Sequence, residues 1–179
     1  MLLARSTFAK IVVRGKENIP ANGGFIIVAN HTSFLDNLLL LGIIPHDLRF
    51  VAASPGFTLP MMRRVYSAAN FISSDIKMEL KDLMLLFMAI KNGENVGAYS
   101  LLPDEEKGGE IGEFTPALIS FIKTTNTPFL PIAIKGTSTV WPTYEYKIIG
   151  TKIEVTIGKL QPAENADNLN KIITDLYNS

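Results

Sequence analysis

The chain has 179 residues with 17 basic and 17 acidic side chains, so its formal net charge is zero. This balance argues against a nucleic-acid partner, because phosphate binding needs a basic excess. There is no cysteine, which excludes disulfides. Apolar residues make up 47% and charged residues 19% of the chain, below the roughly 25% charged of an average domain. The length predicts one domain over residues 1–179, either complete or part of a longer chain.

The apolar excess has three explanations: a membrane span, a sheet buried on both faces, or a surface that contacts lipid or an acyl chain. The longest apolar runs, Leu38–Ile44 and Leu83–Ile90, are too short for a span, which needs about 20 residues. Residues 1–10 lack the extended apolar segment of a signal peptide, and we predict none. The other two explanations are compatible with each other and both stay open.

Strand-like and helix-like segments alternate along the chain. In chain order we predict strands at 11–14 and 25–29, a helix at 37–44, a strand at 48–52, a helix at 61–69, a strand at 71–73, helices and strands in turn at 76–91, 96–102, 115–123 and 129–134, a strand at 152–157 and a helix at 169–176. This order predicts an α/β fold, a single domain with a central mixed, largely parallel sheet flanked by helices. Functional side chains are then expected just beyond the carboxyl ends of the strands.

His31 directly follows the predicted strand 25–29 and is the leading candidate for a reactive group. A neutral imidazole can take a proton from a hydroxyl near pH 7. A carboxylate at its other nitrogen, here Asp36, would fix its tautomer and stabilise the imidazolium. Residues five apart lie about 140° apart around a helix, so the pair can meet only if His31 lies in the turn before the helix. The other histidine, His46, follows a proline and is interpreted as a solvated turn residue.

The same segment has a purely structural interpretation. Ser33 and Asp36 have the spacing of a helix capping box before an apolar run. Asn30, Thr32 and Ser33 would then be only turn and cap residues. The two interpretations do not exclude each other, because Asp36 could serve a cap and a histidine together.

The segment Asn30-His31-Thr32-Ser33-Phe34-Leu35-Asp36, after Gly23-Gly24 and an apolar strand, resembles the first conserved block of the glycerolipid acyltransferases, the family of 1-acylglycerol-3-phosphate acyltransferases. Residues 70–74, 102–107 and 127–134 resemble its later blocks, in the expected order. The resemblance extends over about residues 11–158.

The resemblance implies that His31 is the general base on an acceptor hydroxyl and that Asp36 orients it. The hydroxyl would attack the thioester of acyl-CoA or an acyl-carrier protein, with no cofactor, no metal and no covalent enzyme intermediate. Six further residues are candidates for substrate binding. They are Asn30, Ser33, Ser74, Asp104, Glu105 and Lys107.

Two blocks depart from the family pattern where cations hold the acceptor's phosphate. Ser74 stands where an arginine is expected, and Asp104-Glu105-Glu106-Lys107 stands where the family has Glu-Gly-Thr-Arg. Three interpretations remain: an acceptor without a phosphomonoester, a phosphate held instead by Arg63, Arg64 or Lys107, or a degenerate acceptor site. The segment could also be a plain acidic loop, and the arginine pair a solvated helix face.

Five methionines gather in one stretch, which indicates either a soft core or a tunnel for an acyl chain. They are Met61, Met62, Met78, Met84 and Met88. Little of the sequence precedes residue 25, so we expect the N-terminal membrane-binding helix pair common in the family to be missing or reduced. The chain is then either cut from a longer enzyme or a member of a branch that docks by its apolar face. We predict a cytoplasmic protein that lies peripherally on the inner face of a membrane through an apolar surface.

The sequence therefore predicts an acyltransferase that moves an acyl group from a thioester to the hydroxyl of a lysophospholipid or another lipid-like acceptor. Its predicted partners are the thioester donor, the acceptor, a membrane surface and an acyl-carrier protein. Two rivals remain open: a non-catalytic module that binds lipid or acyl carrier, and a thioester hydrolase that uses water as acceptor.

Overall fold

The computed structural model describes residues 10–33, 35–53, 72–74, 80–101, 111–140 and 152–179. For residues 51–53, 72–74 and 80–83 it describes the backbone alone. The predicted helix 61–69, Phe71 and the start of the predicted helix 76–91 lie outside the described residues.

A seven-stranded sheet runs through the described part of the chain, in the order β1-β7-β6-β2-β5-β3-β4. Its strands are β1 (Lys10–Arg14), β2 (Ile26–Ala29), β3 (Leu48–Ala53), β4 (Ile72–Ser74), β5 (Asn95–Tyr99), β6 (Phe129–Lys135) and β7 (Lys152–Ile157). Each neighbouring pair is parallel except β6 and β7, so the sheet is mixed and largely parallel, as predicted. All four residues of β2 are buried, which explains its continuous apolar run.

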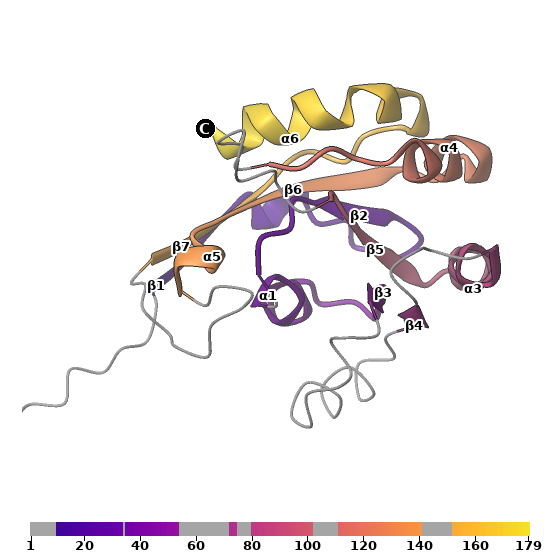
Figure 1. Ribbon diagram of the computed structural model, residues 1–179, viewed down its shortest axis with the longest axis horizontal. Helices are drawn as coiled ribbons and strands as arrows, with labels where there is room; N and C mark the ends of the chain where they lie inside the picture. Colours follow the sequence, from indigo (N-terminus) through magenta and orange to yellow (C-terminus); the bar gives the residue numbers. More distant parts are fainter. Residues whose placement is uncertain (1–9, 34, 54–71, 75–79, 102–110, 141–151) are drawn as a thin grey trace, which may run out of the picture.

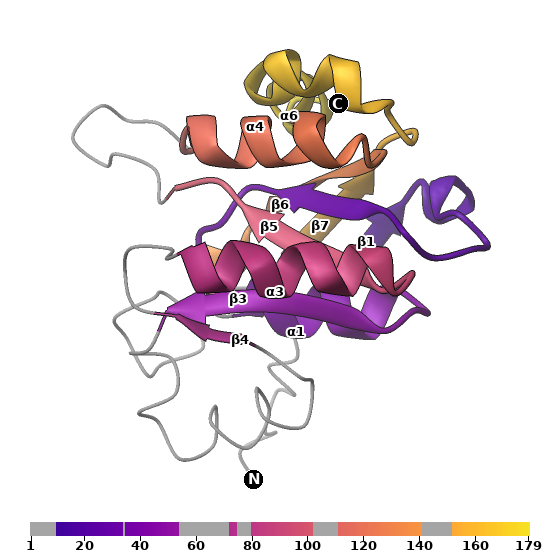
Figure 2. The same ribbon diagram turned by 90° about the vertical axis from the view of Figure 1, so that its right-hand side faces the viewer.

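Helices cover both faces of the sheet (Figure 1). They are α1 (Leu35–Ile43), α3 (Leu80–Lys91), α4 (Pro116–Thr125), α5 (Thr137–Val140) and α6 (Leu169–Tyr177), with short 3-10 turns at η1 (Lys16–Asn18) and η4 (Ala163–Asn168). In the view of Figure 1, α1 lies below the sheet, and α4 and α6 lie above it. In the view of Figure 2, α4 lies above α3 and strands β2 and β5 are seen between them, while side chains of the two helices line one groove.

The two faces of the sheet hold separate cores. Alternate residues of the central strands, Ile27 and Ile132 among them, pack with Leu40 of α1. The intervening residues, such as Ile26, pack with Ile122 of α4 on the other face. Because side chains alternate along a strand, two neighbouring residues of β2 belong to different cores.

The strand predicted at 96–102 is shorter than expected and ends at Tyr99. The Ser100 amide still donates to the Ala29 carbonyl, at the end of β2, but the Leu101 amide turns away and donates to the carbonyl of Glu113. The chain therefore leaves the sheet where β2, its neighbour, ends. Leu101 is 56% exposed, which contradicts its placement in a buried strand.

His46 is not a solvated turn residue. It is half-buried, its Nε2 lies 2.8 Å from the Pro20 carbonyl, and its ring packs edge-on against Phe25. A carbonyl only accepts, so Nε2 is the donor. This histidine ties the turn after α1 to the segment that leads into β2.

Candidate active site

The parallel strands β2, β5 and β6 end at the same edge of the sheet. Ala29 and Tyr99, the last residues of β2 and β5, are in register, whereas β6 continues from Ile132, the other partner of Ala29, to Lys135. The turn after β2 carries Asn30 and His31, and it leads directly into α1. The candidate residues Asn30 and His31 therefore lie at the carboxyl edge of the sheet.

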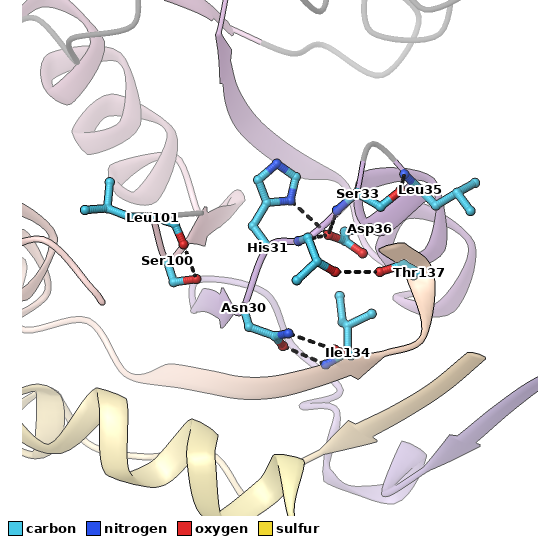
Figure 3. A network of polar contacts seen from close by, with 10 residues as sticks. Asn30, His31, Ser33, Leu35, Asp36, Ser100, Leu101, Ile134 and Thr137 are labelled. Atoms are coloured by element: carbon cyan, nitrogen blue, oxygen red, sulfur yellow. Dashed lines mark hydrogen bonds and ion pairs between the residues drawn. The ribbon is translucent and has the colours of Figure 1, made fainter. Parts of the chain in front are cut away.

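Asn30 is fully buried, and its side chain bridges two strands. Its Nδ2 donates to the Ile134 carbonyl and its Oδ1 accepts from the Ile134 amide, both at 2.7 Å (Figure 3). Because these bonds use both ends of the amide, Asn30 ties the end of β2 to β6. Both polar ends of the predicted substrate-binding residue are thus occupied within the protein.

Asp36 gathers the turn around one carboxylate oxygen. Its Oδ2 accepts from the backbone amides of Thr32 at 2.8 Å and Ser33 at 2.9 Å, and it lies 2.9 Å from Nδ1 of His31. The side chain is fully buried in the first turn of α1, where the helix dipole favours a negative charge. Among the described residues, Oδ1 has no hydrogen-bond partner.

The capping interpretation and the histidine pair therefore hold at once. The carboxylate of Asp36 reaches back to the Ser33 amide, and the Ser33 hydroxyl accepts from the Leu35 amide at 3.2 Å, as in a capping box. Ser33 is 1% exposed, so its hydroxyl serves the helix start. The same carboxylate binds His31 because the histidine lies in the turn and not on the helix.

The contact with Asp36 leaves the other ring nitrogen of His31 pointing away from the carboxylate (Figure 3). A carboxylate is an acceptor, so it holds the proton on Nδ1 and leaves the lone pair on Nε2. Within the part of the chain that the structure describes, Nε2 makes no hydrogen bond. The side chain of His31 is 25% exposed, so this nitrogen can accept a proton from an incoming hydroxyl.

A second contact secures the turn from β6. The hydroxyls of Thr32 and Thr137 lie 2.9 Å apart, and Thr137 is fully buried at the start of α5. Gly136 precedes it with a φ of 88°, and a Cβ there would overlap the Lys152 carbonyl. A glycine is therefore required to bring α5 under the turn. Sequence reasoning missed Thr137 because α5 is too short to show a helical pattern.

Sequence reasoning also missed an aromatic partner of His31. The rings of His31 and Tyr99 are stacked with centroids 4.5 Å apart, and Tyr99 stacks in turn on Phe50 at 5.4 Å. The available signal was the strand end: placing the end of β5 at Tyr99 puts this side chain beside the turn after β2.

The remaining substrate-binding candidates are placed only in part. Ser74 is the last residue of β4 and lies at the same sheet edge, with its side chain not described. Three strand spacings separate β4 from β2, or about 14 Å. Asp104, Glu105 and Lys107 lie outside the described residues, and so do Arg63 and Arg64. The alternative interpretations of these two segments therefore stay open.

The methionines that the structure describes do not form a soft core. Met84 and Met88 are 58% and 57% exposed on α3, and they border an apolar groove of about 220 Å³ between α3 and α4. That groove lies on the face of the sheet opposite α1, away from His31. It is therefore not a tunnel into the candidate site. Met61, Met62 and Met78 lie outside the described residues.

The described residues contain no group of three or more acidic or histidine side chains arranged to hold a metal ion. None of their helices is long and apolar enough to cross a membrane.

Comparison with known proteins decides the family. The model of the family described as Acyltransferase matches residues 10–135, which include every described residue of the candidate site except Thr137. The chain belongs to the acyltransferase family. The resemblance of its sequence blocks to glycerolipid acyltransferases is thereby confirmed.

Curated relatives carry a more specific name. The chain is 26% identical over 142 residues to the chloroplastic 1-acyl-sn-glycerol-3-phosphate acyltransferase BAT2 of Brassica napus, covering 76% of this chain and 40% of that protein. It is 25% identical over 137 residues to the 1-acyl-sn-glycerol-3-phosphate acyltransferase of Bacillus subtilis (strain 168), covering 72% of this chain and 64% of that protein. The chain thus spans about half the length of these relatives.

A solved structure has the same fold. The 1-acyl-sn-glycerophosphate (LPA) acyltransferase PlsC from Thermotoga maritima superposes with a TM-score of 0.78 at 22% identity, covering 94% of this chain and 71% of that one. This likeness confirms the predicted α/β fold of the acyltransferase.

Proposed function

We propose that this acyltransferase moves an acyl group from a thioester to a hydroxyl on a lipid-like acceptor, with His31 as general base. The observation that carries the proposal is the bond between His31 Nδ1 and the buried carboxylate of Asp36, which directs Nε2 outward. Family membership supports the reaction class, and the names of the relatives support a lysophospholipid acceptor.

The proposed step moves one proton and exchanges one bond. Nε2 takes the proton of the acceptor hydroxyl as the oxygen forms a bond to the thioester carbonyl carbon. The carbon–sulfur bond then breaks, and the leaving thiolate takes the proton from the imidazolium. Asp36 takes up no proton in this step, because its role is to hold the imidazole and stabilise its positive charge. The ester and the free thiol are the products.

The acceptor's phosphate is the open part of the proposal. The sequence lacks arginines at the two positions where the family has them, so an acceptor without a phosphomonoester is our first expectation. A phosphate held by Arg63, Arg64 or Lys107 is the second, and a degenerate acceptor site the third. The donor is acyl-CoA or an acyl-carrier protein.

The test is a product analysis with the purified protein. Palmitoyl-CoA and a palmitoylated acyl-carrier protein are each offered with lysophosphatidic acid, lysophosphatidylcholine and monoacylglycerol, and the products are resolved by mass spectrometry. A new ester with one of these acceptors supports the proposal, and the preferred acceptor decides the phosphate question. Free acid as the sole product favours a thioester hydrolase, and donor binding without turnover favours a non-catalytic module. Either result would overturn the proposal.

The exposed side of α3 supports a lipid surface as partner. Met84, Leu85, Phe87 and Met88 are all more than 40% exposed, although the helix is apolar on its buried side as well. We propose that this surface contacts the membrane that holds the acceptor, while the cytoplasmic, inner-face placement stays a prediction.

Vesicle sedimentation tests this contact. The double variant Met84→Ser and Met88→Ser should bind less to vesicles of phosphatidylcholine and phosphatidylglycerol than the unsubstituted protein does. Ile11→Ser is the matched control, because Ile11 is 51% exposed on β1 at the far edge of the sheet. Equal binding of all three proteins would contradict the contact.

A further inference from the structure

The imidazole of the proposed base, His31, is the first of three rings that stack in series. The imidazole of His31 stacks on Tyr99 with ring centroids 4.5 Å apart and planes inclined by 26°. Tyr99 stacks on Phe50 at 5.4 Å and 14°. Phe50 is fully buried in the core under α1, so the last ring of the series is anchored.

The sheet register creates this series. Tyr99 ends β5 directly beside Ala29, two residues before His31, and Phe50 lies on β3 beside Gly97. A Cβ on residue 97 would overlap the Phe50 ring. The glycine therefore opens the space in which Phe50 lies flat against the sheet and supports Tyr99.

A base needs this support because one hydrogen bond does not orient a ring. The bond to Asp36 fixes the position of Nδ1, but rotation about the Cβ–Cγ bond of a histidine has only broad preferences. A flat contact across the ring face restricts that rotation and thereby sets the direction of Nε2. The face of an aromatic ring also attracts a cation, so the stack favours the imidazolium formed when His31 takes a proton.

We propose that Tyr99, supported by Phe50, is a positioning residue that holds the imidazole plane of His31 while Asp36 holds its Nδ1. The proposal rests on the proposed function for its role in turnover. The stack itself can be tested without turnover.

Proton NMR tests the stack directly, because the chain has only two histidines. The variant His46→Gln assigns the imidazole signals of His31 by elimination. In Tyr99→Leu the His31 ring signals should move downfield as the ring current is lost, while those of His46 stay in place. In Tyr99→Phe both sets should stay, since the stacked ring is kept. Unmoved His31 signals in Tyr99→Leu would overturn the proposal.

Steady-state kinetics tests the role in positioning. Tyr99→Leu should lower kcat about 10- to 100-fold with the KM for the thioester within about twofold, because misplacing a reacting group by about 1 Å can cost about 10²-fold. Tyr99→Phe should keep kcat within about twofold. An equal loss of kcat in Tyr99→Phe would show that the hydroxyl, and not the ring, is responsible for the effect. That result would overturn the proposal.

A second variant is needed in case the Tyr99→Leu protein does not fold. Phe50 is suited to this because it stacks on Tyr99 and not on His31. Phe50→Leu keeps an apolar side chain of somewhat smaller volume but removes the supporting ring, so it should lower kcat about threefold to tenfold and shift the His31 signals by less than Tyr99→Leu would. Normal kcat and unmoved His31 signals in folded Phe50→Leu would contradict the supporting role. If the unsubstituted protein shows no turnover, the proposed function fails, and the NMR result still decides the stack.

Discussion

Two polar clusters of this protein use similar groups in opposite surroundings. At the end of β2, the carboxylate of Asp36 is fully buried and accepts from His31 and two backbone amides. At the outer edge of the sheet, Glu154 on β7 pairs with Arg14 at 3.4 Å and Lys152 at 2.9 Å, and both cations are more than half exposed. A buried carboxylate needs all its partners, whereas water can replace the partners of an exposed one.

The two clusters differ in how firmly their interactions fix geometry. In the buried cluster each bond sets the direction of a backbone or ring, and the result is one outward-facing nitrogen. In the exposed cluster the side chains of Lys152 and Arg14 share one carboxylate oxygen, and solvent competes for each bond. Substitutions in the buried cluster should therefore change activity and stability strongly, and those in the exposed cluster only slightly.

The largest effect is expected at His31. His31→Gln should lower acyl transfer about 10²- to 10⁴-fold, because it removes the group that takes the hydroxyl's proton. His46→Gln is the matched control, since it removes the other histidine, which binds the Pro20 carbonyl. The measurement is the initial rate of thiol release with the preferred acceptor. Equal rates in the two variants would contradict the assignment.

Asp36→Asn should come next. An amide keeps the size of the side chain but not the charge that stabilises the imidazolium, so transfer should fall about 10²- to 10³-fold. Stability should fall by about 1–3 kcal/mol, because three donors lose a charged acceptor. Asp175→Asn, on the exposed side of α6, is the control, and thermal unfolding beside the rate assay gives both readings. A variant with normal turnover would show that the carboxylate serves only the helix cap.

Asn30→Ala breaks the buried cluster without touching the carboxylate. It leaves the buried amide and carbonyl of Ile134 without their partner, and it should lower the free energy of unfolding by about 2–4 kcal/mol. Chemical denaturation measures the loss. Asn165→Ala is the control, since its amide bonds only to the Gln161 side chain in a half-buried turn. If both variants lost an equally small free energy of unfolding, the bridge between β2 and β6 would not contribute specially to stability.

The smallest effect is expected at Glu154. The hydrogen bond from Lys152, aided by the charges of Lys152, Arg14 and Lys135, holds the pKa of this carboxyl below its ordinary value of 4.5. The folded state thus favours the ionised form, so the contribution to stability is present above pH 4.5 and disappears as the pH falls through the lowered pKa. In Tm measurements, Glu154→Gln should differ slightly from the unsubstituted protein at neutral pH and not at all in strong acid. A difference that grows in acid would contradict this sign.

Much of the fold follows from local patterns in the sequence. The apolar run 25–29 predicts a strand buried on both faces. The alternation of apolar and polar residues over 152–157 predicts a strand with the same bounds as β7 in the structure. The pairing of His31 with Asp36 could also be predicted, because a turn directly before a helix lets residues five apart meet.

Other features depend on contacts between distant segments, which no local pattern reveals. β5 ends at Tyr99 because its neighbour β2 ends there. The sequence does not show this pairing, so the apolar run predicted a strand that continues to residue 102. The roles of Phe50 and Thr137 arise from register and from a short helix. Asn30 was predicted as a substrate ligand because a polar residue beside the base has the same appearance in sequence whether it faces inward or outward.

The role of His31 as general base depends on which of its ring nitrogens carries the proton. Nitrogen-15 NMR of the protein at a pH where His31 is neutral distinguishes a protonated from an unprotonated ring nitrogen, with His46→Gln for assignment. The contact with Asp36 predicts a proton on Nδ1 and a lone pair on Nε2, ready to accept the proton of a hydroxyl. A proton found on Nε2 of the neutral ring would contradict the assignment of His31 as the base, because that nitrogen could not then take the hydroxyl's proton.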